Sequence, residues 1–177
     1  MGIDPGLSRC GYGVVQRVHE KATGGMKSGL RAMAAGVITT PVSDGLAYRL
    51  SALGAELRAL LAEFTPAVVV VERVLFQTNA RTAMAVGQAS GMALAAAADR
   101  GAEVVQYSPN EVKLAVTGYG SATKAQVQTM VQALLGLDTP PRPPDVADAL
   151  ALAICHLVHA PLAAAAARSG AGSGARP

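Results

Sequence analysis

The sequence predicts an α/β fold in which helices cover both faces of a mixed five-stranded sheet. Three observations predict this fold. The four valines at 68–71 follow Pro66 and form a short, apolar, β-branched run, which is typical of a strand buried on both faces. The predicted elements run in the order three strands, helix, strand, helix, strand and further helices, and a strand that follows a helical crossover is parallel to its neighbour. The chain has 177 residues, which suffices for one domain with a full core and not for two.

Three antiparallel strands are predicted in the first part of the chain, at residues 1–4, 10–15 and 31–39, with a polar, glycine-rich loop at 19–30. The first strand ends at Asp4, because the Pro-Gly pair that follows breaks the strand and forms a tight turn. A lone Asp-Pro-Gly is also a common Asx-type turn, in which the carboxylate bonds its own backbone. An interior strand usually has about five residues. Either residues ahead of Met1 are missing, or this strand is stunted.

The helices are predicted at residues 44–64, 79–100, from 108 onward as a short helix, 123–135 and 145–159, and the fifth strand is predicted at 103–107. Asp44 is the predicted N-cap of the first helix, whose leucines recur at helical spacing and give it one apolar face. Either Thr123 or Ser121 caps the fourth helix. We expect residues 1–160 to form the domain and residues 161–177, rich in alanine, glycine, serine and arginine, to be a disordered tail.

The overall composition narrows the class of protein. The net charge is +3 and the isoelectric point is about 9.1, which is compatible with a polyanionic partner. Cys10 and Cys155 belong to no metal-binding or redox motif, so we expect reduced thiols in a cytoplasmic protein. The apolar stretch 149–167 is interrupted by two histidines and a proline, and we do not expect it to span a membrane.

Four acidic residues are placed where chemistry could use them. Glu72 ends the valine strand and should point into the crevice where α/β sheets bind ligands, although a strand-end charge is often only solvated or paired with a neighbour such as Arg73. Asp145 and Asp148 are three residues apart and share one face of the last helix. Their place in its first turn also suits the helix dipole, which is a purely structural explanation of them.

These carboxylates could converge. If the first and fourth strands are adjacent and parallel, Asp4 and Glu72 end at the same edge of the sheet, and the last helix can bring Asp145 and Asp148 to them. Four carboxylates so close together repel one another unless cations lie between them. Hard oxygen ligands suit Mg²⁺ or Mn²⁺, and two such ions roughly 3.5–4 Å apart would activate water for phosphodiester cleavage.

The second predicted helix carries two glycines, Gly87 and Gly91, one turn apart. Small residues let another helix approach closely. The approaching helix is either another helix of this chain or the same helix of a second copy, as in a homodimer.

Seven stretches of the chain, in order from residue 2 to about 160, resemble the RuvC family of Holliday junction resolvases. They are Gly-Ile-Asp-Pro-Gly at 2–6, Gly-Tyr-Gly-Val at 11–14, Val-Glu-Arg-Val at 71–74, Asn79, Gly-Gln-Ala-Ser-Gly at 87–91, Gly-Tyr-Gly-Ser-Ala-Thr-Lys at 118–124 and Asp-Val-Ala-Asp-Ala-Leu-Ala at 145–151. The resemblance implies an RNase H-like fold. It also implies a homodimer that nicks two opposed strands of a four-way DNA junction in recombination and repair, with Mg²⁺, or Mn²⁺ as substitute, two ions per site. Branch-migration proteins of the RuvA and RuvB kind are the implied partners.

The resemblance also carries residue roles onto this sequence. Asp4, Glu72, Asp145 and Asp148 match the family's catalytic, metal-binding carboxylates. Lys113 and Lys124 match its DNA-phosphate lysines, and the helix of Gly87 and Gly91 matches its dimer helix.

Two departures from the family's pattern concern the chain start and the residues after Glu72. The family usually has a few apolar residues before its Gly-Ile-Asp motif, and here only Met1 stands there. Some members carry, three residues after the catalytic glutamate, a phenylalanine that stacks on bases near the junction centre. That position is Leu75 here, so we expect Phe76 to stack on DNA, or else to cover the core. Arg81, like Arg73, either contacts phosphates or is a solvated surface charge.

Two other functions compete with junction cleavage. An actin-like or sugar-kinase-type phosphotransfer domain also has an Asp-x-Gly turn after its first strand, but such proteins need two domains around the nucleotide, and ATP hydrolysis would identify one. A module that binds branched DNA without cutting it has no use for the carboxylates, because acidic groups that face DNA weaken binding unless metal neutralises them.

Overall fold

The computed structural model describes residues 1–22, 25–73 and 80–170 and contains one five-stranded mixed sheet in the order β3-β2-β1-β4-β5. β1 is antiparallel to β2 and parallel to β4, and β4 is parallel to β5. This confirms the predicted mixed sheet. The elements are β1 (Gly2–Asp4), β2 (Arg9–Ala22), β3 (Gly25–Thr39), α1 (Leu46–Phe64), β4 (Val68–Glu72), α2 (Ala80–Asp99), β5 (Glu103–Tyr107), α3 (Pro109–Thr117), α4 (Lys124–Leu135) and α5 (Pro144–Gly170).

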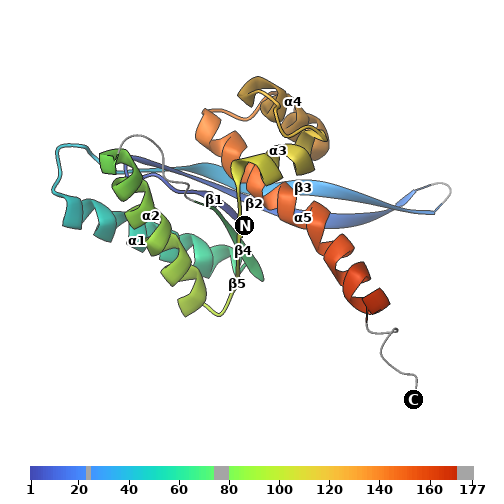
Figure 1. Cartoon of the computed structure of the whole chain (residues 1–177), viewed down its shortest axis with the longest axis horizontal. Helices are drawn as coiled ribbons and strands as arrows, with labels where there is room; N and C mark the ends of the chain where they lie inside the picture. Colours follow the sequence, from blue (N-terminus) through green and yellow to red (C-terminus); the bar gives the residue numbers. More distant parts are fainter. Residues whose placement is uncertain (23–24, 74–79, 171–177) are drawn as a thin grey trace, which may run out of the picture.

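Helices cover the two faces of the sheet, with α1 and α2 on one side and α3, α4 and α5 on the other (Figure 1). The valines of β4 alternate between the two cores, because successive side chains of a strand point to opposite faces. Val69 and Val71 pack with α1 and α2, whereas Val70 packs with α3, α4 and α5, and all three are almost fully buried. Glu72 is two residues beyond Val70, so its side chain points to the α5 face.

Helix α5 lies directly on β1 and β2 because three glycines leave that part of the sheet without side chains. Gly2 pairs with Gly13, and Gly11 pairs with Asp4. A Cβ atom on Gly2 would lie 2.1 Å from the carbonyl oxygen of Ala149, and one on Gly11 would lie 2.1 Å from that of Asp145. The backbone of α5 could not come this close to strands that carried side chains here. This arrangement was not predicted from the sequence.

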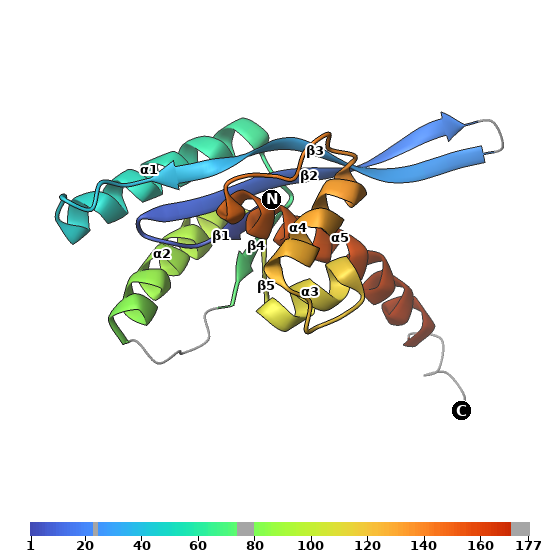
Figure 2. The same cartoon turned by 90° about the horizontal axis from the view of Figure 1, so that it is seen from above.

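The hairpin of β2 and β3 is longer than predicted. β2 continues to Ala22 and β3 begins at Gly25, so most of the expected loop at 19–30 is strand. Figure 2 shows the two strands extending as a ribbon beyond the rest of the sheet. The polar residues here are compatible with this structure, because an antiparallel ribbon can face water while its backbone groups pair across the hairpin.

The helix boundaries correct two further predictions. The N-cap of α1 is Gly45, which makes no side-chain cap bond, and Asp44 instead accepts a hydrogen bond from Ser43. Asp44 is therefore not the cap. α5 continues to Gly170 rather than ending near His159, so residues 161–170 are helical and not a disordered tail. Alanine has the highest helix propensity, which explains the extension through the alanine-rich stretch. Residues 171–177 are outside the described residues.

Helix α4 resolves the alternative that the sequence left open. Thr123 is its N-cap and accepts a hydrogen bond from the backbone N–H of Gln126, whose side chain in turn accepts one from the backbone N–H of Thr123. In the described part of the chain, no helix is both long enough and apolar enough to cross a membrane.

Candidate active site

Asp4 and Glu72 end two neighbouring parallel strands. Gly2 pairs with Val70 and Ile3 with Val71, so the next residue on each strand is a carboxylate. Both side chains are therefore at the same edge of the sheet and on the face that α5 covers, as predicted. The ladder fixes their separation, because the strands cannot slip without turning the valines away from both cores.

Helix α5 brings a third carboxylate to this edge. Asp148 lies near the start of the helix, over the strand ends, and with Asp4 and Glu72 it lines a cavity of about 160 Å³. Lys113 of α3 and Lys124 of α4 line the same cavity. Five residues that are distant in the sequence thus converge on one small space, and two of them carry positive charge.

The two strand carboxylates are held in an unfavourable environment for ionisation. Burial and, to a smaller extent, repulsion from Glu72, Asp148 and Asp145 together raise the pKa of Asp4 to about 7. Burial, followed by the charge of Asp148, also raises the pKa of Glu72. A bound cation at this edge would relieve the repulsion.

Each carboxylate of α5 is paired with a cation. Lys124 Nζ lies 3.0 Å from Asp148 Oδ2, and this hydrogen bond raises the pKa of Lys124. Arg9 donates from Nε at 3.1 Å and from Nη2 at 2.9 Å to Asp145 Oδ2. The bond from Arg9 holds the pKa of Asp145 below its usual value. Asp145 lies beside the cavity, not among the residues that line it.

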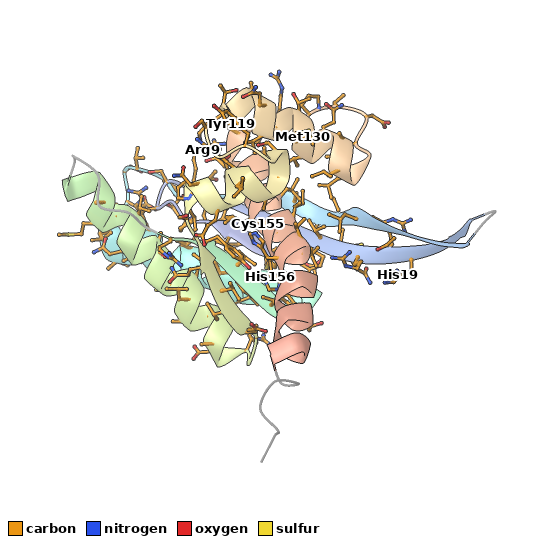
Figure 3. The ribbon with its side chains drawn as sticks, turned by 45° about the vertical axis from the view of Figure 1, so that its right-hand side comes forward. Arg9, His19, Tyr119, Met130, Cys155 and His156 are labelled. Carbon is orange, nitrogen blue, oxygen red and sulfur yellow. The ribbon has the colours of Figure 1, made fainter. Side chains whose placement is uncertain are left out.

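Arg9 was not among the site residues predicted from the sequence. It is the first residue of β2, directly after the turn that follows Asp4, and Figure 3 shows it at the opposite end of that strand from His19. The available signal was its position: an arginine within one turn of a predicted acidic site is a candidate counter-ion.

The donor set suits a hard divalent ion, although the site is not preassembled. Among residues 1–22, 25–73 and 80–170, no three histidine, cysteine, aspartate or glutamate side chains are close enough together to hold one ion. Asp145 and Asp148 are instead engaged by Arg9 and Lys124. Carboxylate oxygens are the ligands that Mg²⁺ and Mn²⁺ prefer. The residues fit such an ion if Asp148, which already lines the cavity, exchanges Lys124 for the ion and Asp145 exchanges Arg9 for it.

The remaining predicted DNA contacts are placed only in part. Arg73 is exposed next to Glu72, and its Nη2 donates to the carbonyl oxygen of Gln106 at 3.1 Å. Phe76 and Leu75 are outside the described residues, and so is the side chain of Arg81 in the first turn of α2.

The predicted dimer helix has an open face. A Cβ atom on Gly87 or on Gly91 would meet nothing within 4 Å. Met84, one turn before Gly87, is 66% exposed. These three positions form a stripe at helical spacing that does not pack against the described part of this chain.

Neither cysteine has the chemistry of a nucleophile. Cys10 and Cys155 are buried, free thiols, and burial raises their pKa values to about 11 and about 12. Figure 3 labels Cys155 and His156 side by side on α5. His156 Nδ1 lies 3.2 Å from the hydroxyl of Tyr107, so this histidine has a structural partner.

The fold and the carboxylate edge define the class of the protein. A mixed sheet with carboxylates at the ends of two adjacent parallel strands, covered by a helix that carries two more, is the arrangement of an RNase H-like nuclease. A family described as crossover junction endodeoxyribonuclease RuvC matches residues 1–156. The chain belongs to this RuvC family of Holliday junction resolvases.

Individual relatives agree with the family match. Crossover junction endodeoxyribonuclease RuvC of Leifsonia xyli is 50% identical over 165 residues, which are 93% of this chain and 76% of the relative. That of Salinispora arenicola is 49% identical over 178 residues, covering 98% of each chain. The structure of Thermus thermophilus RuvC superposes with a TM-score of 0.79 at 36% identity, covering 92% of this chain and 95% of that one.

A second Thermus thermophilus RuvC structure, in complex with Holliday junction substrate, has a TM-score of 0.79 at 34% identity and covers 91% of this chain and 93% of that one. The chain is accordingly a junction-resolving endodeoxyribonuclease, and neither the phosphotransfer alternative nor the non-cleaving alternative is favoured.

Proposed function

We propose that Asp4, Glu72, Asp145 and Asp148 hold two Mg²⁺ ions, replaceable by Mn²⁺, with which the protein hydrolyses one phosphodiester bond in each of two opposed junction strands. The observation that carries this proposal is the cavity lined by Asp4, Glu72 and Asp148, in which burial and mutual repulsion raise the pKa values of both strand carboxylates. Negative groups crowded in this way favour a cation between them.

The chain's own residues would bind and orient the reacting groups. When bound, Mg²⁺ polarises the phosphate and lowers the pKa of the attacking water. Asp4 and Glu72 are fixed by the β1–β4 ladder, so they are the rigid part of the site. Asp145 and Asp148 are positioned only by α5, and they would supply the remaining ligands of the ions from the helix that covers this face of the sheet. Cleavage would leave a 5′-phosphate and a 3′-hydroxyl.

Basic residues around the cavity would bring the DNA to the carboxylates. Lys113 and Lys124 line the cavity and are placed to contact phosphates of the strand to be cut. Arg73 and Arg81 are further candidates for phosphate contacts, and Phe76 is our candidate for stacking on an unpaired base, a contact worth about 1–3 kcal/mol. The relative from Thermus thermophilus in complex with Holliday junction substrate supports a junction as the ligand.

A homodimer would supply the two sites that paired nicks require. The open stripe of Met84, Gly87 and Gly91 on α2 supports a dimer face, because two glycines one turn apart let the same helix of a second copy approach closely. Solution mass tests this proposal, and a monomer at micromolar concentration would contradict it.

We further propose that the protein works in the cytoplasm with branch-migration proteins of the RuvA and RuvB kind. The bacterial origin of the relatives supports this location, and the two buried free thiols are compatible with a reducing compartment.

Asp4→Asn on a synthetic four-way junction tests the site. The variant should bind the junction at least as tightly as the wild type and should not nick it with Mg²⁺, because asparagine keeps the size of the side chain but lacks the ionised ligand. Asp99→Asn is the matched control, since Asp99 is exposed at the end of α2, and it should nick normally. Unchanged nicking by Asp4→Asn would refute the assignment.

A further inference from the structure

Arg9 and Asp145 form an ion pair at the rim of the carboxylate site. Both hydrogen bonds go from the guanidinium to the same oxygen, Oδ2. The side chain of Arg9 is 48% exposed and that of Asp145 is 23% exposed. Exposed ion pairs contribute little to stability, because water screens the charges and ordering the side chains costs entropy. The guanidinium can therefore leave Asp145 at small cost if a better arrangement of charges becomes available.

The backbone on either side of this pair is fixed, so only the side chains are free to move. The backbone of α5 at Asp145 packs against Gly11, two residues after Arg9. The turn before Arg9 is held through Ser8, whose carbonyl oxygen accepts a hydrogen bond from the backbone N–H of Thr40 at 3.3 Å and whose hydroxyl accepts one from Arg49 Nη2 at 2.6 Å. The backbone at Arg9 is therefore held in place, and only the side chain extends to Asp145.

The positive charges of Arg9 and Lys124 do not balance the negative charges of the four carboxylates. When the four carboxylates are ionised, Arg9 and Lys124 neutralise two of the four negative charges and leave two. Divalent ions would supply more positive charge than these two carboxylates need. Arg9 and Lys124 would then be surplus cations beside the site, on β2 and α4 respectively, and available to phosphates.

We propose that Arg9 is a positioning residue that holds Asp145 until the carboxylate takes up a divalent ion, and that the released guanidinium then binds a DNA phosphate. This inference rests on the proposed function, because it assumes that Asp145 is a metal ligand. It makes the binding of metal and of junction DNA mutually reinforcing, since each favours the state in which Arg9 has left Asp145. Arginine suits the task, because its planar fork fits a carboxylate and a phosphate equally well.

The first test is metal affinity in the absence of DNA. Ca²⁺ binding is measured by titration calorimetry on the wild type, Arg9→Gln, Arg9→Lys and Arg100→Gln, the last being a control that removes an exposed arginine at the far end of α2. Arg9→Gln should bind Ca²⁺ about two- to fivefold more tightly than the wild type, because a competing cation is gone. Arg9→Lys and Arg100→Gln should bind it like the wild type. Equal or weaker binding by Arg9→Gln would overturn the proposal.

The second test is the salt dependence of junction binding, with Ca²⁺ and with EDTA. Each phosphate contact contributes about 0.9 to the slope of log K against log salt. Arg9→Gln should lower this slope by about one per subunit with Ca²⁺ and should leave it unchanged with EDTA, because Arg9 is free for DNA only when Asp145 has another partner. Arg9→Lys should keep the wild-type slope. An equal loss of slope under both conditions would mean a permanent phosphate contact and would overturn the proposal.

Failure of the inference can be told from failure of the proposed function. A wild type that neither binds Ca²⁺ nor nicks the junction with Mg²⁺ would refute the metal site itself. A wild type that does both, next to an Arg9→Gln variant indistinguishable from it in Ca²⁺ affinity and slope, would refute only the role of Arg9. Thermal unfolding of each variant shows that it is folded before either titration.

Discussion

Replacing Asp4 by asparagine should stabilise the metal-free protein at alkaline pH. Burial, followed by repulsion from Glu72, Asp148 and Asp145, raises the pKa of Asp4 from 3.8 to about 7. The folded state therefore binds more protons than the unfolded state between about pH 4 and pH 7. Stability contributed by this group is present at low pH, declines as the pH rises through this window and is lost above it. Asparagine carries no charge and avoids the loss.

The expected gain in the free energy of unfolding follows from the change in the pKa of Asp4 on folding. About three pKa units at about 1.4 kcal/mol each give an upper limit of roughly 4 kcal/mol for the cost of ionising Asp4 in the fold. The cavity is open to solvent at its rim, so we expect Asp4→Asn to exceed the wild type by about 2–4 kcal/mol at pH 8. At pH 4 the two proteins should differ by less than about 1 kcal/mol, because Asp4 is protonated in the folded state and about half protonated in the unfolded state.

Urea unfolding in EDTA at pH 4, 6 and 8 measures this difference. Asp99→Asn, at the exposed end of α2, is the control and should follow the wild type at every pH. Addition of Mg²⁺ at pH 8 should stabilise the wild type and not Asp4→Asn, because a ligand that binds only the folded state adds to its stability. If Asp4→Asn is no more stable than the wild type at pH 8 in EDTA, the carboxylates are not crowded as described.

Three further predictions concern the parts that support the site. Gly11→Ala places a Cβ atom 2.1 Å from the carbonyl oxygen of Asp145, so it should cost about 1–3 kcal/mol in urea unfolding and reduce nicking, whereas Gly29→Ala, whose new atom has ordinary contacts, should do neither. Thr123→Ala removes the N-cap of α4 and should cost about 1 kcal/mol, with a return of stability in Thr123→Ser. The affinity for Ca²⁺ by calorimetry should fall about tenfold from pH 8 to pH 6, because a ligand must be deprotonated to bind and the pKa of Asp4 is about 7; a constant affinity would contradict this.

The sequence predicted the centre of the sheet because one physical rule governs it. Four consecutive valines can be buried only in a strand that is covered on both faces, and in the structure they pack alternately into two cores. The following charge has to leave the core, which places Glu72 at the strand end. Asp4 reaches the same edge because parallel neighbours end together. The residue types and the pairing of the strands were therefore enough to predict the positions of Glu72 and Asp4.

The helix N-caps and the partner of Arg9 could not be predicted in this way, because the local sequence is compatible with more than one outcome. Thr123 and Ser121 are both acceptable N-caps, and only the spacing from Thr123 to Gln126 could have favoured the residue that caps α4, through a capping box. Asp44 is likewise an acceptable cap, but the helix begins one residue later than that role requires. Arg9 pairs with a residue 136 positions away, and no periodicity within one segment reports such a partner.

The glycines of the first two strands carried information that periodicity could have revealed. Gly11 and Gly13 are two residues apart, so in a strand they share one face, and pairing adds Gly2 to the same smooth surface. A sheet face without side chains is costly unless a helix backbone packs against it, because glycine loses the most conformational freedom on folding. That helix is α5, which carries Asp145 and Asp148. Because these glycines have no side chains, α5 can lie close to the sheet. This close packing sets the distance between the strand carboxylates and the helix carboxylates. Any side chain added there should separate the two halves of the site before it disturbs either one.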